Sequence, residues 1–282
     1  MIKKHIEFLA VDLGERNYIQ YQNLKRAQDY IKEEFRSYGY ILKEQVYSLG
    51  NQDFENIIAT KIGKDKKDKI IIICAHYDSA YGSPGADDNA SGVAGILELA
   101  RLISSQDLDK TIKFIAFCNE EPPFYMSTDM GSFRYAKNAS KMKEDIEAVL
   151  CLESIGFYQD KRNSQTYPLF LHFFYPDKGN FIAMVSNFKS GHLLKKIVKE
   201  FRSASSFPIE YLVAPLSLVP AIGLSDNWSF WHFGYKAIMI TDTAFYRNPY
   251  YHSPQDTLDK LDCQKIALLI EGLYKVILNL AR

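Results

Sequence analysis

Residues 69–78 read KIIIICAHYD. The unbroken apolar run over residues 70–75 is typical of a strand that is buried on both faces of a parallel sheet. It ends in two chemically active side chains, His76 and Asp78. Ligands of open α/β sheets bind beyond the carboxyl ends of such strands. This stretch therefore predicts both an α/β fold and the edge at which a site lies.

Residues 85–92, GADDNASG, lead into a helical pattern over residues 93–103 (VAGILELARLI). Acidic and small polar residues favour helix N-termini, where they accept from free backbone N–H groups and meet the positive end of the helix dipole. One carboxylate is enough for that purpose, yet Asp87 and Asp88 stand side by side. With the histidine and aspartate of the preceding strand, three carboxylates and an imidazole are predicted near one strand end.

The composition excludes several classes of function. The chain has 282 residues, of which 47% are hydrophobic, and it can bury a sizeable core. Its 34 basic residues balance 34 acidic ones, so no nucleic-acid partner is expected. No apolar run approaches the roughly 20 residues of a membrane span, so no membrane partner is expected. Residues 1–16 carry too much charge for a signal peptide, which predicts a cytoplasmic protein, although a trimmed exported form has the same sequence.

Strand-like runs alternate with helical patterns along the chain. Strands are expected near residues 41–47, 55–62, 69–75, 111–118, 147–153, 168–174 and 236–241. Helices are expected near residues 22–38, 92–104, 190–203, 226–233 and 262–280. This alternation predicts an α/β sheet with helices on both faces. Residues 203–225, rich in Ser, Pro and Ala, are the best candidate for a long loop over a site. No repeat or linker interrupts the chain, and one domain over residues 1–282 is expected.

The four cysteines are Cys74, Cys118, Cys151 and Cys263. The first three lie within apolar runs, which predicts buried free thiols in place of disulfides. Each also stands two positions before a potential metal ligand. Cysteine ligation is nevertheless not expected, because no paired cysteine spacing is present.

Polar side chains gather after the predicted strands. They are His76 and Asp78, then Asn119, Glu120 and Glu121, then Glu153, and far downstream Tyr251 and His252. Imidazole and carboxylate oxygen form a ligand set that suits zinc, and one shared carboxylate can bridge two cations. Such a pair can activate a water and polarise the group that it attacks. The adjacent aspartates then have different tasks: one faces the site, and its neighbour supports the loop.

Five motifs occur in the order and approximate spacing of the zinc-dependent aminopeptidases of metallopeptidase family twenty-eight. They are HYDS (76–79), GADDNASG (85–92), NEE (119–121), LES (152–154) and YHSPQDT (251–257). The chain resembles this family over most of its length, from GERNY at residues 14–18 onward. The resemblance implies a three-layer α/β/α sandwich around a mixed, largely parallel sheet.

The resemblance also implies a metal centre with two zinc ions. Asp88 matches the bridging ligand. His76 and Glu153 match the remaining ligands of one site, and Glu121 and His252 those of the other. Glutamate at 153 replaces the aspartate of some branches, which leaves oxygen ligation intact but the spacing of the metals open.

Three further residues match catalytic positions of the family. Glu120 corresponds to the general base that takes a proton from water and passes it to the leaving amine. Asp78 corresponds to the acid that orients the imidazole of His76. Tyr251 corresponds to a tyrosine that donates to the developing oxyanion in part of the family.

Other positions depart from the family or stay open. SDNWSF at residues 225–230 resembles a family SDH motif, but Asn227 replaces its histidine, so the role of Asp226 is open. Two prolines follow the NEE motif, where better-known aminopeptidases carry a glycine-containing turn. Arg247 could recognise a substrate carboxylate, although a structural ion pair is the favoured interpretation. Several aromatic residues could line a specificity pocket or belong to the core: Phe173, Phe174, Tyr175, Trp228 and Trp231.

Three functions are compatible with these features. The favoured one is a zinc-dependent exopeptidase, an aminopeptidase acting on peptides as a monomer. A second is a glutaminyl-cyclase-like enzyme with a single zinc, against which the GADDNASG loop and the Tyr251-His252 pair argue. The third is a catalytically silent binding relative. The chain keeps all five ligands and the base, which argues against this third function.

Overall fold

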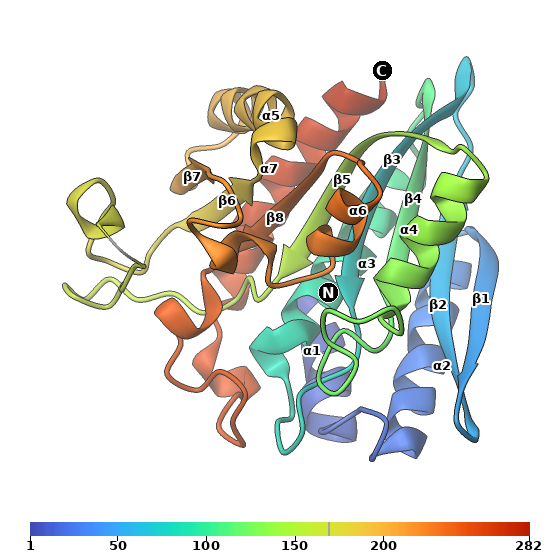
Figure 1. The fold of residues 1–282 in the computed structure, drawn as a ribbon, viewed down its shortest axis with the longest axis horizontal. Helices are drawn as coiled ribbons and strands as arrows, with labels where there is room; N and C mark the ends of the chain where they lie inside the picture. The colour runs from blue at the N-terminus through green and yellow to red at the C-terminus, as the bar shows by residue number, and fades with distance from the viewer. Residues whose placement is uncertain (169) are drawn as a thin grey trace.

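In the computed structural model, which describes residues 1–168 and 170–282, eight strands form one sheet (Figure 1). Their order across the sheet is β1-β2-β4-β3-β5-β8-β6-β7. The strands are β1 (Ile41–Leu49), β2 (Gln52–Lys61), β3 (Lys66–His76), β4 (Lys110–Phe117), β5 (Asp145–Glu153), β6 (Ile182–Ser186), β7 (Ile209–Val213) and β8 (Ala237–Thr241).

The sheet is mixed and largely parallel, as expected. The central strands β4, β3, β5 and β8 all run in one direction. The antiparallel pairs are β1 with β2, β2 with β4, and β6 with β8. The edge strand β7 is parallel to β6. The carboxyl ends of the four central strands therefore meet at one edge of the sheet, where the predicted site residues lie.

Helices cover both faces of the sheet and complete a three-layer sandwich. One layer holds α1 (Ile2–Ile6), α2 (Tyr21–Ser37), α3 (Gly92–Ile103), α5 (Gly191–Ala204) and α7 (Cys263–Ala281). The other holds α4 (Gly131–Lys141) and α6 (Asn227–His232). In Figure 1, α4 and α6 lie in front of the sheet and α3 and α7 behind it. Short helical turns occupy Glu7–Leu13, Ala86–Ser91, Leu171–Phe173, Phe188–Ser190, Pro220–Gly223, Ala244–Tyr246 and Leu258–Lys260.

The apolar run of β3 is buried on both faces, as its sequence predicts. Alternate residues point to opposite sides of a strand. Ile71 and Ile73 join the core beneath α3 and α7, whereas Ile72 and Cys74 join the core beneath α4 and α6. Burial on both sides explains why this strand shows no polar alternation.

One predicted strand is wrong, and the short strands β6 and β7 and the helices α1 and α4 were not anticipated. Of residues 168–174, residue 169 lies outside the described part, and Leu171–Phe173 form a helical turn. Phe173 and Phe174 are 72% and 79% exposed, so neither belongs to the core. An aromatic run forms a strand only where a neighbouring strand can pair with it. Residues 203–225, expected as a loop, contain β7 in their first half.

The cysteines are free thiols, and Cys74, Cys118 and Cys151 are buried, as predicted. Cys74 and Cys151 lie opposite each other on β3 and β5, with their sulfur atoms 3.4 Å apart. Among the described residues, no helix combines the length and apolarity required to cross a bilayer.

Candidate active site

The site lies at the carboxyl ends of the central strands. His76 ends β3, Glu153 ends β5, and Glu120 and Glu121 follow β4. Asp88 comes from the loop between β3 and α3, and His252 from the loop that follows β8. These six residues form three overlapping groups, and within each group the potential ligand atoms lie within 4.8 Å of one another. Within the described residues, the five predicted ligands and the predicted base thus lie together.

Asp88 lies between the two histidines. Its Oδ1 is 3.2 Å from Nε2 of His76, and its Oδ2 is 3.0 Å from Nε2 of His252. The two oxygens of one carboxylate therefore face different imidazoles. The remaining carboxylates follow the same division, because Glu153 Oε2 is 3.2 Å from His76 and Glu121 Oε2 is 3.3 Å from His252. The cluster has two halves that share Asp88.

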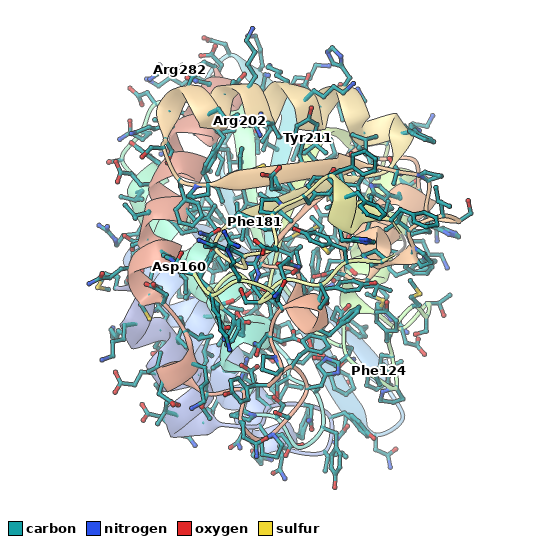
Figure 2. All side chains as sticks on the ribbon, turned by 90° about the vertical axis from the view of Figure 1, so that its left-hand side faces the viewer. Phe124, Asp160, Phe181, Arg202, Tyr211 and Arg282 are labelled. Atoms are coloured by element: carbon teal, nitrogen blue, oxygen red, sulfur yellow. The ribbon has the colours of Figure 1, made fainter. Side chains whose placement is uncertain are left out.

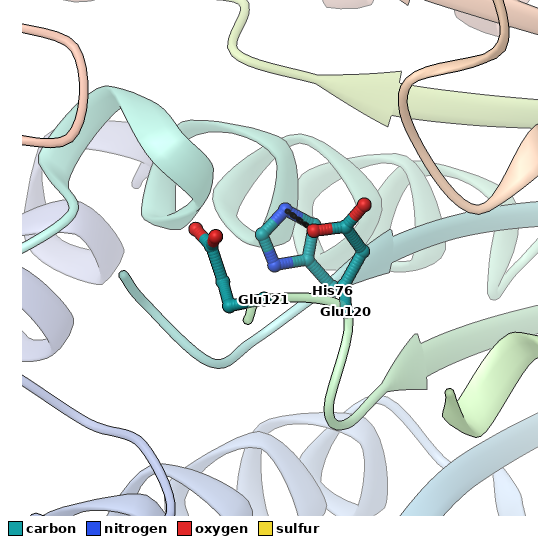
Figure 3. Close-up of side chains that lie close together, drawn as sticks. All are labelled: His76, Glu120 and Glu121. Atoms are coloured by element: carbon teal, nitrogen blue, oxygen red, sulfur yellow. Dashed lines mark ion pairs between the residues drawn. The ribbon is translucent and has the colours of Figure 1, made fainter. Parts of the chain in front are cut away.

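Glu120 occupies a different position from Glu121 despite being its neighbour. Figure 3 shows the two carboxylates on opposite sides of the His76 ring. Glu120 Oε2 is 4.0 Å from Nε2 of His76, and Glu120 Oε1 has no hydrogen-bond partner among the described residues. Burial raises the pKa of Glu120 well above its usual range; the charge of His76 opposes this, and Glu121 adds to it. Such a carboxylate has the high proton affinity that a general base requires.

Asp78 contacts both the histidine and the NEE segment. Its Oδ1 lies 3.4 Å from Nδ1 of His76, and its backbone carbonyl lies 3.2 Å from the same nitrogen. The backbone N–H groups of Glu120 and Glu121 donate to the two carboxylate oxygens of Asp78, at 3.2 and 3.1 Å. Asp78 therefore ties the end of β3 to the loop after β4, a contact that its position in the sequence did not suggest.

Asp87 points away from the cluster, in keeping with the expected division between the two aspartates. Its Oδ1 accepts from the backbone N–H of Gly156 and its Oδ2 from the side chain of Asn248, both at 2.8 Å. Burial and the neighbouring Asp242 raise the pKa of Asp87 well above its usual range. Asp87 thus links its own loop to the segments after β5 and β8.

Two residues that position the Asp88 loop were not singled out from the sequence. Asp256 accepts the backbone N–H groups of Asp87 and Asp88, at 2.9 and 3.2 Å. Arg16 is fully buried and donates to the carbonyls of Pro84 and Gly85, at 2.5 and 2.9 Å. Both residues stand inside motifs that carry the family resemblance, YHSPQDT and GERNY, which was the available signal.

The cluster holds an excess of negative charge. Burial alone would lower the pKa of His76, but Glu153, Asp78 and Asp88 outweigh it and raise that pKa well above its usual range. Burial alone would also lower the pKa of His252, but Asp88 and Glu121 outweigh it and raise that pKa to about 10. Each imidazole therefore attracts a cation, either a proton or a metal ion, to its own nitrogen.

The residues present fit a metal centre. Buried atoms that lack a hydrogen-bond partner among the described residues include Nε2 of His76, Oδ1 of Asp88 and Oε1 of Glu121. Burial, followed by the charge of Asp88, raises the pKa of Glu121 to about 7. Buried charges are stable when they are paired or coordinate metals. Imidazole nitrogens and carboxylate oxygens are donors that zinc accepts.

An apolar pocket opens beside the cluster. Glu153 and Tyr251 belong to its wall, and the ring of Tyr251 stacks on His252 with a centroid separation of 3.9 Å. Burial and the nearby carboxylates, Asp88 first among them, raise the pKa of Tyr251 well above its usual range, so its phenol stays a hydrogen-bond donor. The loop before α6 also reaches the site, because Ser225 Oγ donates to Glu153 Oε2 at 2.7 Å.

The structure shows the surroundings of Asp226 and Arg247, whose roles the sequence left open. Asp226 is buried next to the cluster without a hydrogen-bond partner for either carboxylate oxygen among the described residues, and burial raises its pKa to about 7. Arg247 is buried and donates to the backbone carbonyl of Phe181 at 2.8 Å and to the side chain of Gln165 at 2.7 Å. These bonds give Arg247 a structural role, but the favoured ion pair is not found among the described residues, and its Nη2 has no hydrogen-bond partner among them.

The family profile described as Peptidase family M28 matches residues 56–277. A protein of Escherichia coli K12 named "Uncharacterized protein YfbL" is 37% identical over 287 residues, which cover 99% of this chain and 87% of that protein. Aminopeptidase YwaD of Bacillus subtilis is 50% identical over 72 residues, but these cover only 25% of this chain and 16% of that protein.

Solved structures with the same fold include both enzyme classes that the sequence suggested. A zinc aminopeptidase from Bacillus subtilis superposes with a TM-score of 0.81 and 16% identity, covering 100% of this chain and 94% of that one. A glutaminyl cyclase from Bacteroides thetaiotaomicron superposes with a TM-score of 0.74 and 18% identity, covering 99% and 96%. At such identities the likeness establishes the fold alone.

The profile spans most of the chain, including the strand ends that carry the clustered ligands. The fold and the donor set agree with it. The chain therefore belongs to peptidase family M28, a family of zinc peptidases.

Proposed function

We propose that this protein is an aminopeptidase that removes single residues from the free N-terminus of peptides. Its metal centre takes two zinc-class ions. His76 and Glu153 would hold one, Glu121 and His252 would hold the other, and Asp88 would be shared by both. The observation that carries this proposal is the position of Asp88, whose two oxygens lie 3.2 and 3.0 Å from different imidazoles.

The side chains divide the chemical work. Zinc-class ions bound here would supply Lewis acidity for activating a water and polarising the scissile carbonyl. Glu120 takes the proton from the attacking water and delivers it to the leaving amine. Asp78 holds the His76 ring and the backbone of Glu120 in place through the contacts described above. Tyr251 donates its phenol hydrogen to the oxyanion that develops on the carbonyl oxygen.

Two observations support an exopeptidase over the alternatives. The site retains all five ligands and the base, which a silent binding relative has no need to keep. The pairing of each imidazole with its own glutamate favours two ions, whereas a glutaminyl cyclase resembling the family needs one. The segment of 72 residues that is 50% identical to Aminopeptidase YwaD also supports the aminopeptidase assignment.

A substrate panel tests the polarity of cleavage. The protein, loaded with zinc, is incubated with leucyl peptides, the same peptides acetylated at the N-terminus, and peptides that begin with glutamine. We expect stepwise release of free N-terminal residues, no cleavage of the acetylated peptides, and hydrolysis without cyclisation of the glutamine peptides. Equal cleavage of free and acetylated peptides would remove the aminopeptidase assignment. Formation of pyroglutamate would establish the cyclase alternative.

A further inference from the structure

The pocket beside the candidate metal centre extends across four neighbouring strands. It begins at Glu153 on β5, passes β8 and β6, and reaches Glu210 on the edge strand β7. Neighbouring strands lie about 4.8 Å apart, so these three steps cover roughly 14 Å. Figure 2 views this side of the molecule and labels Phe181 and Tyr211, which both line the pocket. Only a long side chain entering from the metal centre can approach the far end.

The wall between the two ends is apolar. Ala183 and Val185 of β6, Leu212 of β7 and Met239 of β8 line it, together with Phe181. Ala183 pairs with Glu210 in the register of β6 and β7. A flexible aliphatic chain is therefore well accommodated along this wall.

The far end carries a carboxylate, that of Glu210, which no described side chain pairs with directly. Its side chain is half-buried and has no hydrogen bond or ion pair with any described residue, although its backbone belongs to the β6–β7 ladder. Burial raises its pKa, and the charge of Arg202 opposes the effect. Arg202 itself is directed elsewhere, because it donates to the carbonyl of Ile209 and lies over the ring of Tyr211.

Two tyrosines complete this end without satisfying the carboxylate. The rings of Tyr167 and Tyr175 stack with their centroids 5.8 Å apart, and both line the pocket. Their hydroxyl groups donate to the backbone carbonyls of Pro176 and Tyr211, at 2.6 and 2.8 Å. The far end thus offers an acceptor carboxylate and aromatic rings but no free donor from these phenols. This combination suits an ammonium or guanidinium group.

We propose that the pocket receives the side chain of the substrate's N-terminal residue and selects lysine and arginine, with Glu210 pairing their terminal cation. This inference rests on the proposed aminopeptidase function. The aliphatic part of the substrate side chain packs along the apolar wall, while its charge reaches the carboxylate at β7. Glu210 is thereby a specificity residue and takes no part in the chemistry.

The test compares Lys-p-nitroanilide with norleucine-p-nitroanilide, which has a similar chain without the charge. We expect the wild-type protein to show a higher kcat/KM for lysine. Glu210→Gln should lower kcat/KM for lysine by about tenfold to a hundredfold, the range for a lost hydrogen bond to a charged group. The value for norleucine should stay unchanged, which also shows that the variant is folded. The control Glu200→Gln, on α5 and outside the pocket, should change neither value.

The opposite results separate this inference from the proposed function. If norleucine is released normally but Glu210→Gln leaves the ratio of lysine to norleucine unaltered, the aminopeptidase assignment stands and the role of Glu210 is overturned. A wild-type preference for norleucine over lysine overturns it as well. If the wild-type protein cleaves neither anilide, the proposed function fails and the inference falls with it.

Discussion

Glu120 and Glu121 are adjacent and chemically identical, yet their carboxylates have different neighbours. Glu121 Oε2 lies 3.3 Å from His252 within one half of the metal cluster. Glu120 is 4.0 Å from His76 and keeps one oxygen without a hydrogen-bond partner among the described residues. Two isosteric substitutions can therefore test the proposed proton carrier separately from the proposed metal ligand.

Glu120→Gln keeps the size of the side chain but removes its ability to take a proton. We expect turnover to fall by about a hundredfold to ten-thousandfold, the usual contribution of a general base, with little change in metal content. Glu121→Gln should instead lose or weaken one ion and regain part of its activity at high added zinc. Turnover and metal stoichiometry are measured for both variants. Metal loss in Glu120→Gln with retention in Glu121→Gln would invert the assignment, and full activity in both would exclude this segment from catalysis.

His5 provides a pH-dependent contribution far from the metal cluster. It is fully buried, its Nδ1 lies 2.7 Å from the Tyr30 hydroxyl, and burial lowers its pKa to about 4, against the opposing charge of Glu34. The unfolded chain, where the pKa is near the usual 6.5, therefore binds more protons between pH 6.5 and 4. Folding stability from this group is present above pH 6.5 and is lost as the pH falls through that window.

His5→Gln removes this titration. The free energy of unfolding of the wild type should decrease relative to that of the variant by roughly 2 kcal/mol between pH 7 and pH 4.5, because one pKa unit corresponds to about 1.4 kcal/mol. Urea denaturation at both pH values measures the difference. The exposed His192 on α5 offers a control, and His192→Gln should show no such trend. A pH-independent difference between wild type and His5→Gln would contradict the prediction.

At the scale of elements, the loop between β3 and α3 is held by contacts from distant segments. Arg16, which precedes α2, donates to the carbonyl of Tyr77 at 2.8 Å and to those of Pro84 and Gly85 in the loop. Burial lowers the pKa of Arg16 to about 10, although Asp256 and other acids oppose the shift. The planar guanidinium satisfies several carbonyls that otherwise remain buried without a donor.

Arg16→Lys preserves the positive charge but replaces the planar guanidinium, with its five N–H donors, by a single ammonium group. We expect it to lower the free energy of unfolding by about 2 to 4 kcal/mol, because each buried carbonyl left without a donor costs about 1 to 3 kcal/mol. Zinc affinity should also decrease, since Asp88 lies in the loop that Arg16 holds. Urea denaturation and zinc titration measure the two effects. Arg26→Lys, on the exposed side of α2, is the matched control and should alter neither; a similar loss in both variants would refute a specific role for Arg16.

At the scale of the whole molecule, the metal centre connects segments that are far apart in the chain. The predicted ligands follow β3, β4, β5 and β8, so ions bound among them would join the ends of four strands. Without cations, four carboxylates share a buried cluster with two imidazoles. Metal binding to the folded state alone stabilises that state by mass action.

Removal of metal with a chelator should therefore lower both activity and thermal stability. A ligand present at a thousand times its Kd adds about 4 kcal/mol, which corresponds to a decrease in Tm of roughly 10 °C on removal. Addition of zinc should restore both properties. Metal analysis of the restored protein should give about two ions per chain. A stoichiometry near one with full activity would favour the cyclase alternative, and an unchanged Tm and activity would argue against a metal enzyme.

The sequence alone was sufficient for the fold class and for the residues that gather at the site. The run over residues 70–75 is buried on both faces, and polar side chains follow the ends of parallel strands, so their convergence could be inferred from local pattern. Matching motifs then suggested individual tasks for them, and those tasks stay predictions. The strand length and periodicity that made this possible are properties of neighbouring residues.

Only the tertiary structure decided the remaining features. The five-residue strands β6 and β7 are too short for a clear periodicity, and the aromatic run near residues 168–174 found no partner strand. Arg16 and Asp256 acquire their importance through hydrogen bonds to a loop that is distant in sequence. Glu210 lies in the pocket because β7 pairs with β6 at the edge of the sheet. Each of these depends on which segments meet in space, and local propensity and periodicity do not specify such long-range contacts; for Arg16 and Asp256 only the family motifs offered a signal.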